Sequence, residues 1–130
     1  MIVDTSAIVA ILRNEPEARP FLEAMSAAET VRMSAGSWLE LTVVATRSAD
    51  REIADAADLL LARFNVSIEG VTKEIAAIGA EAYRRYGRGT QHKAGLNLGD
   101  CFAYALAKAI GEPLLFKGDD FARTDITPAL

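Results

Sequence analysis

Four acidic residues, far apart in the chain, occupy positions from which their side chains could meet. Asp4 and Asp119 each follow a short apolar run, while Glu40 and Asp100 lie in segments with a helical apolar pattern. Carboxylate oxygens are the ligands that Mg²⁺ and Mn²⁺ prefer, and both ions keep several bound waters. If the four residues converge, the sequence predicts a site for a divalent cation.

Each of these acids also has an ordinary structural explanation. Asp4 can cap the helix that follows it, and Asp119 can belong to a GDD turn. Asp100 can be a first-turn acid, where the helix dipole favours the anion and lowers its pKa. Glu40 can be an exposed residue or pair with Arg47, although its neighbours one turn away make a semi-apolar strip. None of these explanations accounts for the convergence of all four at one edge.

The elements that position these acids are short strands alternating with helices. Residues 2–3, 31–33, 66–68 and 114–116 are apolar runs without polar alternation, so we expect both faces of each strand to be covered. This pattern predicts a three-layer α/β domain with a short-stranded, mainly parallel central sheet. The carboxyl ends of parallel strands share one edge, where ligands bind. With no repeat or linker in 130 residues, we expect residues 1–130 to form a single domain.

Capping residues and apolar spacing define six predicted helices. Their expected first residues or caps are Thr5 or Ser6, Pro16 or Glu17, Ser34, Asp50, Thr72, and Asn97 or Leu98. Gly111 is expected to end the last of them. Trp38 and Cys101 lie on apolar helix faces and are predicted to be core residues. The segment GRGTQHKAG, residues 87–95, is predicted to be a loop, and Ile126 to belong to a short last strand.

Composition excludes several classes of protein. The net charge of −4 argues against binding nucleic acid by bulk positive charge, but not against an enzyme that works through bound cations. The single Cys101 excludes an internal disulfide and fits a reducing cytoplasm. One cysteine and one histidine cannot make a Cys/His zinc site. No apolar run is long enough to span a membrane, and the opening segment lacks the basic start of a signal peptide.

Four blocks of the sequence together resemble the PIN-domain nucleases, and within them the VapC-type toxins of bacterial toxin–antitoxin pairs. The blocks are MIVDTSAIVAIL, SAGSWLELTVV, LNLGDCFAYALAK and LLFKGDDFARTDI. Their order and spacing over nearly the whole chain are more specific than any one block. The resemblance implies a PIN-like fold and a Mg²⁺-dependent endoribonuclease, with Mn²⁺ as a plausible substitute.

The resemblance also implies roles for the acidic residues. Asp4, Glu40, Asp100 and Asp119 match the acidic quartet of the family. Asp4 and Asp100 are expected to bind the metal directly. Glu40 and Asp119 are expected either to bind it through water or to complete a second metal site when substrate arrives. Because the fourth position varies within the family, Asp120 is the second choice for it. A metal-activated water would attack the phosphate and leave a 5′-phosphate and a 3′-hydroxyl.

A second group of residues is predicted to touch the substrate or support the acids. Thr5 and Ser6 match the family's DTS motif and are expected to hold the first carboxylate or a metal-bound water. Basic residues near the predicted loop form either a solvated helix end or a rim that contacts phosphates, and the sequence favours neither. The members of this basic rim are Arg84, Arg85, Arg88, His92, Lys93 and Lys117.

Partners and alternative functions follow from the same comparison. The resemblance implies an RNA substrate, a VapB-type antitoxin docking near residues 18–25 and 53–61, and a homodimer. A metal-dependent phosphatase or receiver-like domain is the enzymatic alternative. Both need a second acid close to Asp4, but the residues after Asp4 are Thr5, Ser6 and Ala7. A binding module whose acids hold only a structural cation is the non-catalytic alternative.

Overall fold

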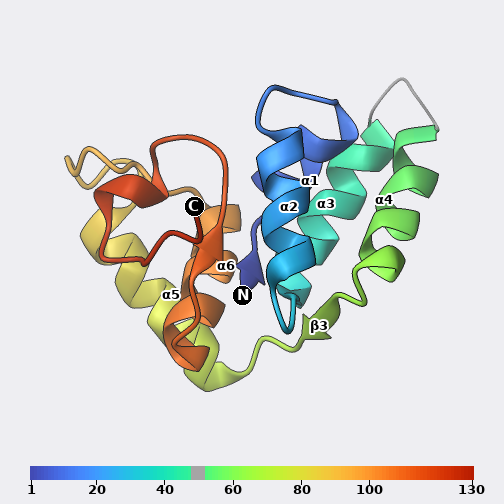
Figure 1. Ribbon diagram of the computed structural model, residues 1–130. Helices are drawn as coiled ribbons and strands as arrows, with labels where there is room; N and C mark the ends of the chain where they lie inside the picture. Colours follow the sequence, from blue (N-terminus) through green and yellow to red (C-terminus); the bar gives the residue numbers. More distant parts are fainter. Residues whose placement is uncertain (48–51) are drawn as a thin grey trace.

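A four-stranded, wholly parallel sheet organises the computed structural model, which describes residues 1–47 and 52–130 (Figure 1). The strand order is β3-β2-β1-β4, with Ile2 opposite both Arg32 and Leu114. This order places β1 at the centre, beside β2 and β4. The strands are β1 (Ile2–Val3), β2 (Arg32–Ser34), β3 (Ser67–Glu69) and β4 (Leu114–Leu115).

In the part of the chain that the structure describes, six α-helices lie between the strands and one short 3-10 helix follows β4. They are α1 (Thr5–Leu12), α2 (Ala18–Ala27), α3 (Ala35–Arg47), α4 (Glu52–Arg63), α5 (Lys73–Tyr86), α6 (Leu98–Ile110) and η1 (Phe121–Arg123). The predicted caps Thr72 and Asn97 accept hydrogen bonds from the third residues of α5 and α6, and Gly111 ends α6 in the left-handed conformation. Asp4, not Thr5 or Ser6, caps α1. The predicted start of a helix at Asp50 lies outside the described residues.

Two hydrophobic cores, one on each face of the sheet, produce the three layers. Adjacent residues of a strand point to opposite faces. Ile2 and Leu114 therefore join the core formed with α5 and α6, while Val3 and Leu115 join the core formed with α1, α2, α3 and α4. Figure 1 shows the same division, with α5 and α6 on one side of the molecule and α1 to α4 on the other. The predicted three-layer α/β architecture is confirmed.

Three local predictions differ from the structure. The edge strand β3 is not covered on both faces, since the Ile68 side chain is 40% exposed. Trp38 is 43% exposed on the outer side of α3 and is not a core residue, whereas Cys101 is buried as predicted. The expected last strand at Ile126 is reduced to a single parallel bridge between Pro128 and Leu114. No helix in the described part of the chain is long and apolar enough to cross a membrane.

Candidate functional site

Asp4 stands at the carboxyl end of the central strand, where its side chain is fixed by the helix it caps. Its Oδ2 accepts hydrogen bonds from the backbone N–H of Ser6, at 2.9 Å, and from the Ser6 hydroxyl, at 2.5 Å. Its Oδ1 is buried and has no hydrogen-bond partner among residues 1–47 and 52–130. Burial raises the pKa of Asp4, and the nearby charge of Glu40 adds to this, although the Ser6 hydrogen bonds oppose it. An acceptor without a partner at such depth fits a site that binds a cation.

Asp100 lies in the first turn of α6, held by a reciprocal capping box. Its Oδ2 accepts from the backbone N–H of Asn97 at 2.7 Å, and its own N–H donates to the Asn97 side chain at 2.9 Å. Burial raises the pKa of Asp100 to about 6, and the charges of Asp4, Asp120 and Glu40 add to that rise. The expectation that the helix terminus lowers this pKa is therefore wrong. Burial among other carboxylates outweighs the hydrogen bond from Asn97.

Glu40 reaches the same place from α3, because two glycines let the helices approach closely. A Cβ at Gly99 would lie 2.2 Å from Oε1 of Glu40, so this carboxylate rests directly on the residue before Asp100. A Cβ at Gly36 would lie 2.3 Å from the Phe102 ring, which packs α3 onto α6. Sequence reasoning missed Gly99. A glycine in the first turn of an otherwise good helix, where it lowers stability, was the available signal.

The fourth acidic position is divided between two neighbours in the turn after β4. The Asp119 side chain is 80% exposed, and its Oδ2 lies 3.5 Å from Arg123 Nη2. Asp120 is half-buried, and its charge is among those that raise the pKa of Asp100. Asp120 therefore lies close enough to Asp100 to act on it, and Asp119 turns toward a surface arginine.

These carboxylates supply the donor chemistry that a hard divalent cation needs. The set contains only oxygen donors and includes the orphaned Oδ1 of Asp4. Burial, and to a lesser extent repulsion from neighbouring carboxylates, raises the pKa of both Asp4 and Asp100. A nearby cation would relieve both effects. Among the described residues, no three acidic, histidine or cysteine side chains stand close enough to bind one ion together. A set of oxygen donors alone fits a hard cation such as Mg²⁺.

The predicted supporting residues take different positions. Ser6 holds Asp4, and its hydroxyl also accepts from the backbone N–H of Lys117 at 3.0 Å, which ties β4 to the site. The Thr5 hydroxyl instead donates to the carbonyl of Ser37 at 3.0 Å. The Lys117 ammonium is paired with Glu15 and Glu17 from the loop between α1 and α2. Lys117 therefore differs from the other predicted rim residues, because two carboxylates already neutralise it.

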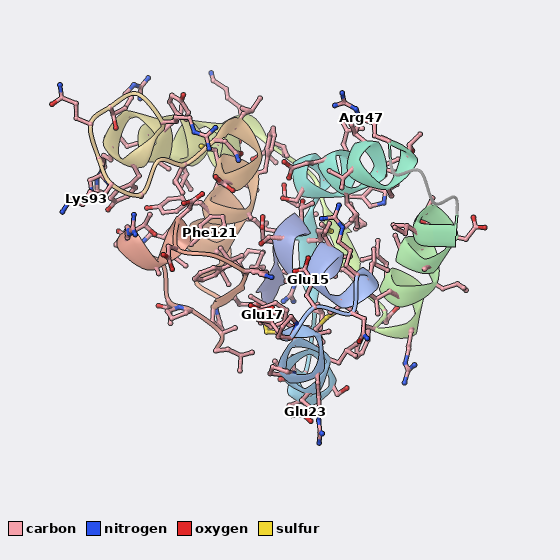
Figure 2. The ribbon with its side chains drawn as sticks, turned by 90° about the horizontal axis from the view of Figure 1, so that it is seen from above. Glu15, Glu17, Glu23, Arg47, Lys93 and Phe121 are labelled. Atoms are coloured by element: carbon pink, nitrogen blue, oxygen red, sulfur yellow. The ribbon has the colours of Figure 1, made fainter. Side chains whose placement is uncertain are left out.

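The remaining basic residues spread over the end of α5 and the loop after it. Arg84 pairs with Glu81 on the surface, and the Arg85 guanidinium lies 4.8 Å from the centroid of the Tyr86 ring. Arg88, His92 and Lys93 are on the loop that runs to Leu96, immediately before Asn97 and Asp100. In Figure 2, Lys93 lies at the outer edge of the molecule, Phe121 lies further in, and Glu15 and Glu17 lie near the centre. Basic side chains thus gather at the end of α5 and on the loop that leads into α6.

Comparison with known proteins agrees with the fold. The sequence profile of the PIN domain matches residues 1–126, so the chain belongs to the PIN domain family. Ribonuclease VapC42 of Mycobacterium tuberculosis is 50% identical over 129 residues, which cover 99% of this chain and 98% of that protein. Within the PIN domain family, the chain therefore belongs with the VapC ribonucleases.

Solved structures of the same group share the architecture. The crystal structure of VapC20 of Mycobacterium tuberculosis, a sarcin-ricin loop cleaving toxin, has a TM-score of 0.74 at 18% identity and covers 97% of this chain and 95% of its own. VapBC2 of Rickettsia felis, bound to a DNA fragment from its promoter, has a TM-score of 0.74 at 18% identity, with coverage of 98% and 94%. At this identity the two structures support the fold alone.

Proposed function

We propose that this protein is a Mg²⁺-dependent endoribonuclease that acts as the toxin of a toxin–antitoxin pair. The observation that carries the proposal is the meeting of Asp4, Glu40 and Asp100, from three separate elements, within one another's electrostatic field. Family membership supplies the reaction, because the relatives that match the whole chain are named ribonucleases. Mn²⁺ has the same preference for oxygen ligands and is a plausible substitute.

The protein residues divide the work of the reaction. Asp4, through its orphaned Oδ1, and Asp100 would hold the cation, while Glu40 would accept the proton of the attacking water. The cation would lower the pKa of that water and offset charge on the phosphate. Ser6 keeps Asp4 in position. We assign the fourth acidic role to Asp120, supported by its effect on Asp100 and by the outward direction of Asp119.

Ribonuclease assays with matched variants test the proposal. Cleavage of RNA should require Mg²⁺ and stop with EDTA, and Asp4→Asn or Asp100→Asn should lower kcat by about a hundredfold or more. Asp55→Asn, on the exposed surface of α4, removes the same charge and should leave cleavage unchanged. Full activity of either site variant would contradict the assignment.

The product ends and the fourth acid can be tested in the same assay. Metal-activated water predicts 5′-phosphate and 3′-hydroxyl ends, and a 2′,3′-cyclic phosphate would rule that mechanism out. Asp120→Asn should lower kcat more than Asp119→Asn, and the reverse order would return the role to Asp119. Transfer of phosphate from acetyl phosphate to Asp4 would instead support the phosphatase or receiver-like alternative. Metal binding without cleavage of any RNA would support the binding module.

The partners of this activity form the second part of the proposal. We propose that residues 1–130 act as one cytoplasmic domain, held inactive by a VapB-type antitoxin that docks over α2 and α4. Family membership supports this partner. We further propose a homodimer through the apolar groove between α5 and α6, which has a volume of about 220 Å³ and lies beside Leu98, 72% exposed, and Tyr83, 40% exposed. Leu98→Ser should weaken self-association in analytical ultracentrifugation, while Leu59→Ser on α4 should not.

A further inference from the structure

Arg123 connects two segments that flank the acidic site. It is the last residue of η1, directly after the turn that carries Asp119 and Asp120. Its Nη1 donates to the backbone carbonyl of Lys93 at 2.9 Å, and its Nη2 lies 3.5 Å from Asp119. Phe121, which is buried against Phe116, anchors the same short helix in the core. Arg123 therefore extends from a fixed base toward the loop that carries Arg88, His92 and Lys93.

The loop between α5 and α6 is well anchored at its base but has few contacts at its tip. Gly87 and Leu96 form a parallel bridge, and the backbone N–H of Arg88 donates to the Leu96 carbonyl at 2.8 Å. Leu96 is fully buried. Beyond that base, residues 89–95 make one hydrogen bond to another element within the described parts of the chain, and it comes from Arg123. Ala94 is buried in the core with Tyr86 and Leu96, so the exposed residues 89–93 of the tip are placed by that anchor, by the Arg123 guanidinium and by the packing of His92 against Tyr86.

We propose that Arg123 is a positioning residue, which holds the basic loop beside the acidic site so that its cations can bind the RNA backbone. This inference rests on the proposed ribonuclease function. The loop runs directly into Asn97 and Asp100, and η1 follows directly on Asp120, so the bond from Arg123 to Lys93 joins the two chain segments that deliver these acids. Holding them together fixes the distance between the basic loop and the place where phosphate is cut.

The contacts of Arg123 favour this role over direct capture of a phosphate. One of its terminal nitrogens donates to a carbonyl, and the other faces the carboxylate of Asp119, which offsets its charge. The Lys93 side chain takes no part in that bond, because Arg123 binds its backbone oxygen. Lys93 is therefore a matched control, since its replacement removes a loop charge and leaves the connection to η1 in place.

Steady-state kinetics on a short RNA with Mg²⁺ separate the two roles. Arg123→Gln should raise KM about tenfold with kcat within about twofold, because binding of the backbone is lost and chemistry is not. Lys93→Gln should raise KM about threefold by the loss of one phosphate contact. Arg19→Gln, which removes an equal charge from an exposed pair on α2, should leave KM unchanged. If Arg123→Gln does not fold, Arg123→Lys, which keeps the charge but not the planar pair of donors, replaces it.

The double variant is the decisive measurement. If Arg123 acts by placing Lys93, its replacement should raise KM less in the Lys93→Gln background than in the wild type. Hydrogen exchange at the amides of residues 89–94 should also be faster in Arg123→Gln and unchanged in Lys93→Gln. Additive effects on KM, or unchanged exchange, would overturn the inference while leaving the ribonuclease proposal intact. A wild-type protein that neither cleaves nor binds RNA would overturn both.

Discussion

Replacement of Gly99 by alanine adds one atom, the Cβ, which should impair catalysis without lowering the stability of the fold. The new Cβ would lie 2.2 Å from Oε1 and 2.8 Å from Oε2 of Glu40, so the carboxylate cannot stay where it is. Gly99 lies in the first turn of α6 without a left-handed backbone, and alanine can adopt the same conformation. The carboxylate is the free end of a flexible side chain, so it can move away at little cost to the fold.

The size of both effects can be estimated from this geometry. Ordinary van der Waals contact begins near 3.4 Å, so Oε1 must shift by 1.2 Å from its present 2.2 Å. A misplacement of about 1 Å at a reacting group costs on the order of a hundredfold in rate. Alanine in place of glycine within a helix stabilises it by up to about 1 kcal/mol. Gly99→Ala should therefore lower kcat about a hundredfold while leaving the melting temperature unchanged or slightly higher.

Single-turnover cleavage and thermal unfolding measure the two quantities on the same preparation. Gly70→Ala is the matched control, since a Cβ there meets no atom within 4 Å, and it should leave cleavage unaffected. Wild-type kcat in Gly99→Ala would show that the position of the Glu40 carboxylate does not matter to the reaction. A large fall in melting temperature would show that the contact supports the fold rather than the chemistry.

Three further predictions concern ionisation and hydrogen bonding. Because the folded-state pKa of Asp100 is raised from 3.8 to about 6, its contribution to the stability of the metal-free protein is full below pH 4 and lost as the pH rises past 6. EDTA-treated protein should thus lose roughly 2 kcal/mol from this group between pH 4 and 7, and Asp100→Asn should flatten that slope in urea titrations. Ser6→Ala removes a hydrogen bond to Asp4 and the acceptor of a backbone N–H, so it should cost about 1–2 kcal/mol in urea unfolding and lower the affinity for Mg²⁺ in calorimetry. Tyr104→Phe removes the hydrogen bond that a buried phenol donates to Asp125. It should lower the free energy of unfolding by about 1–2 kcal/mol without changing kcat. A fall in kcat would contradict a purely structural role for that hydrogen bond.

The fold could be predicted because its signals are local. The short apolar runs fix the strands. Thr72 and Asn97 begin helices and Gly111 ends one, through hydrogen bonds and backbone conformations that depend only on nearby residues. The parallel direction of the strands follows from the alternation of strands and helices. Trp38 was misplaced because an apolar stripe does not tell which side of a helix another element covers.

The site was predictable only in outline, because its details depend on contacts across the chain. The pKa of Asp100 reflects burial and three carboxylates from other elements, and none of these is visible from its place in the first turn of α6. Lys117 does not act as a free cation of the predicted basic rim, because it pairs with Glu15 and Glu17, about a hundred positions earlier in the chain. Such long-range pairings follow from packing and not from any local pattern.

The division of the interior into two cores has a consequence for how the protein opens. Asp4 comes from the central sheet and Asp100 from α6 in one layer, while Glu40 comes from α3 on the other side. The two layers meet at central strands of two and three residues, β1 and β2, and at the close approach of α3 to α6. An ion held by these acids would clamp the two halves as a disulfide does in proteins of oxidising environments. Without the ion, each layer could move more freely relative to the other. The first structural effect of metal loss should therefore be looser packing between the two layers.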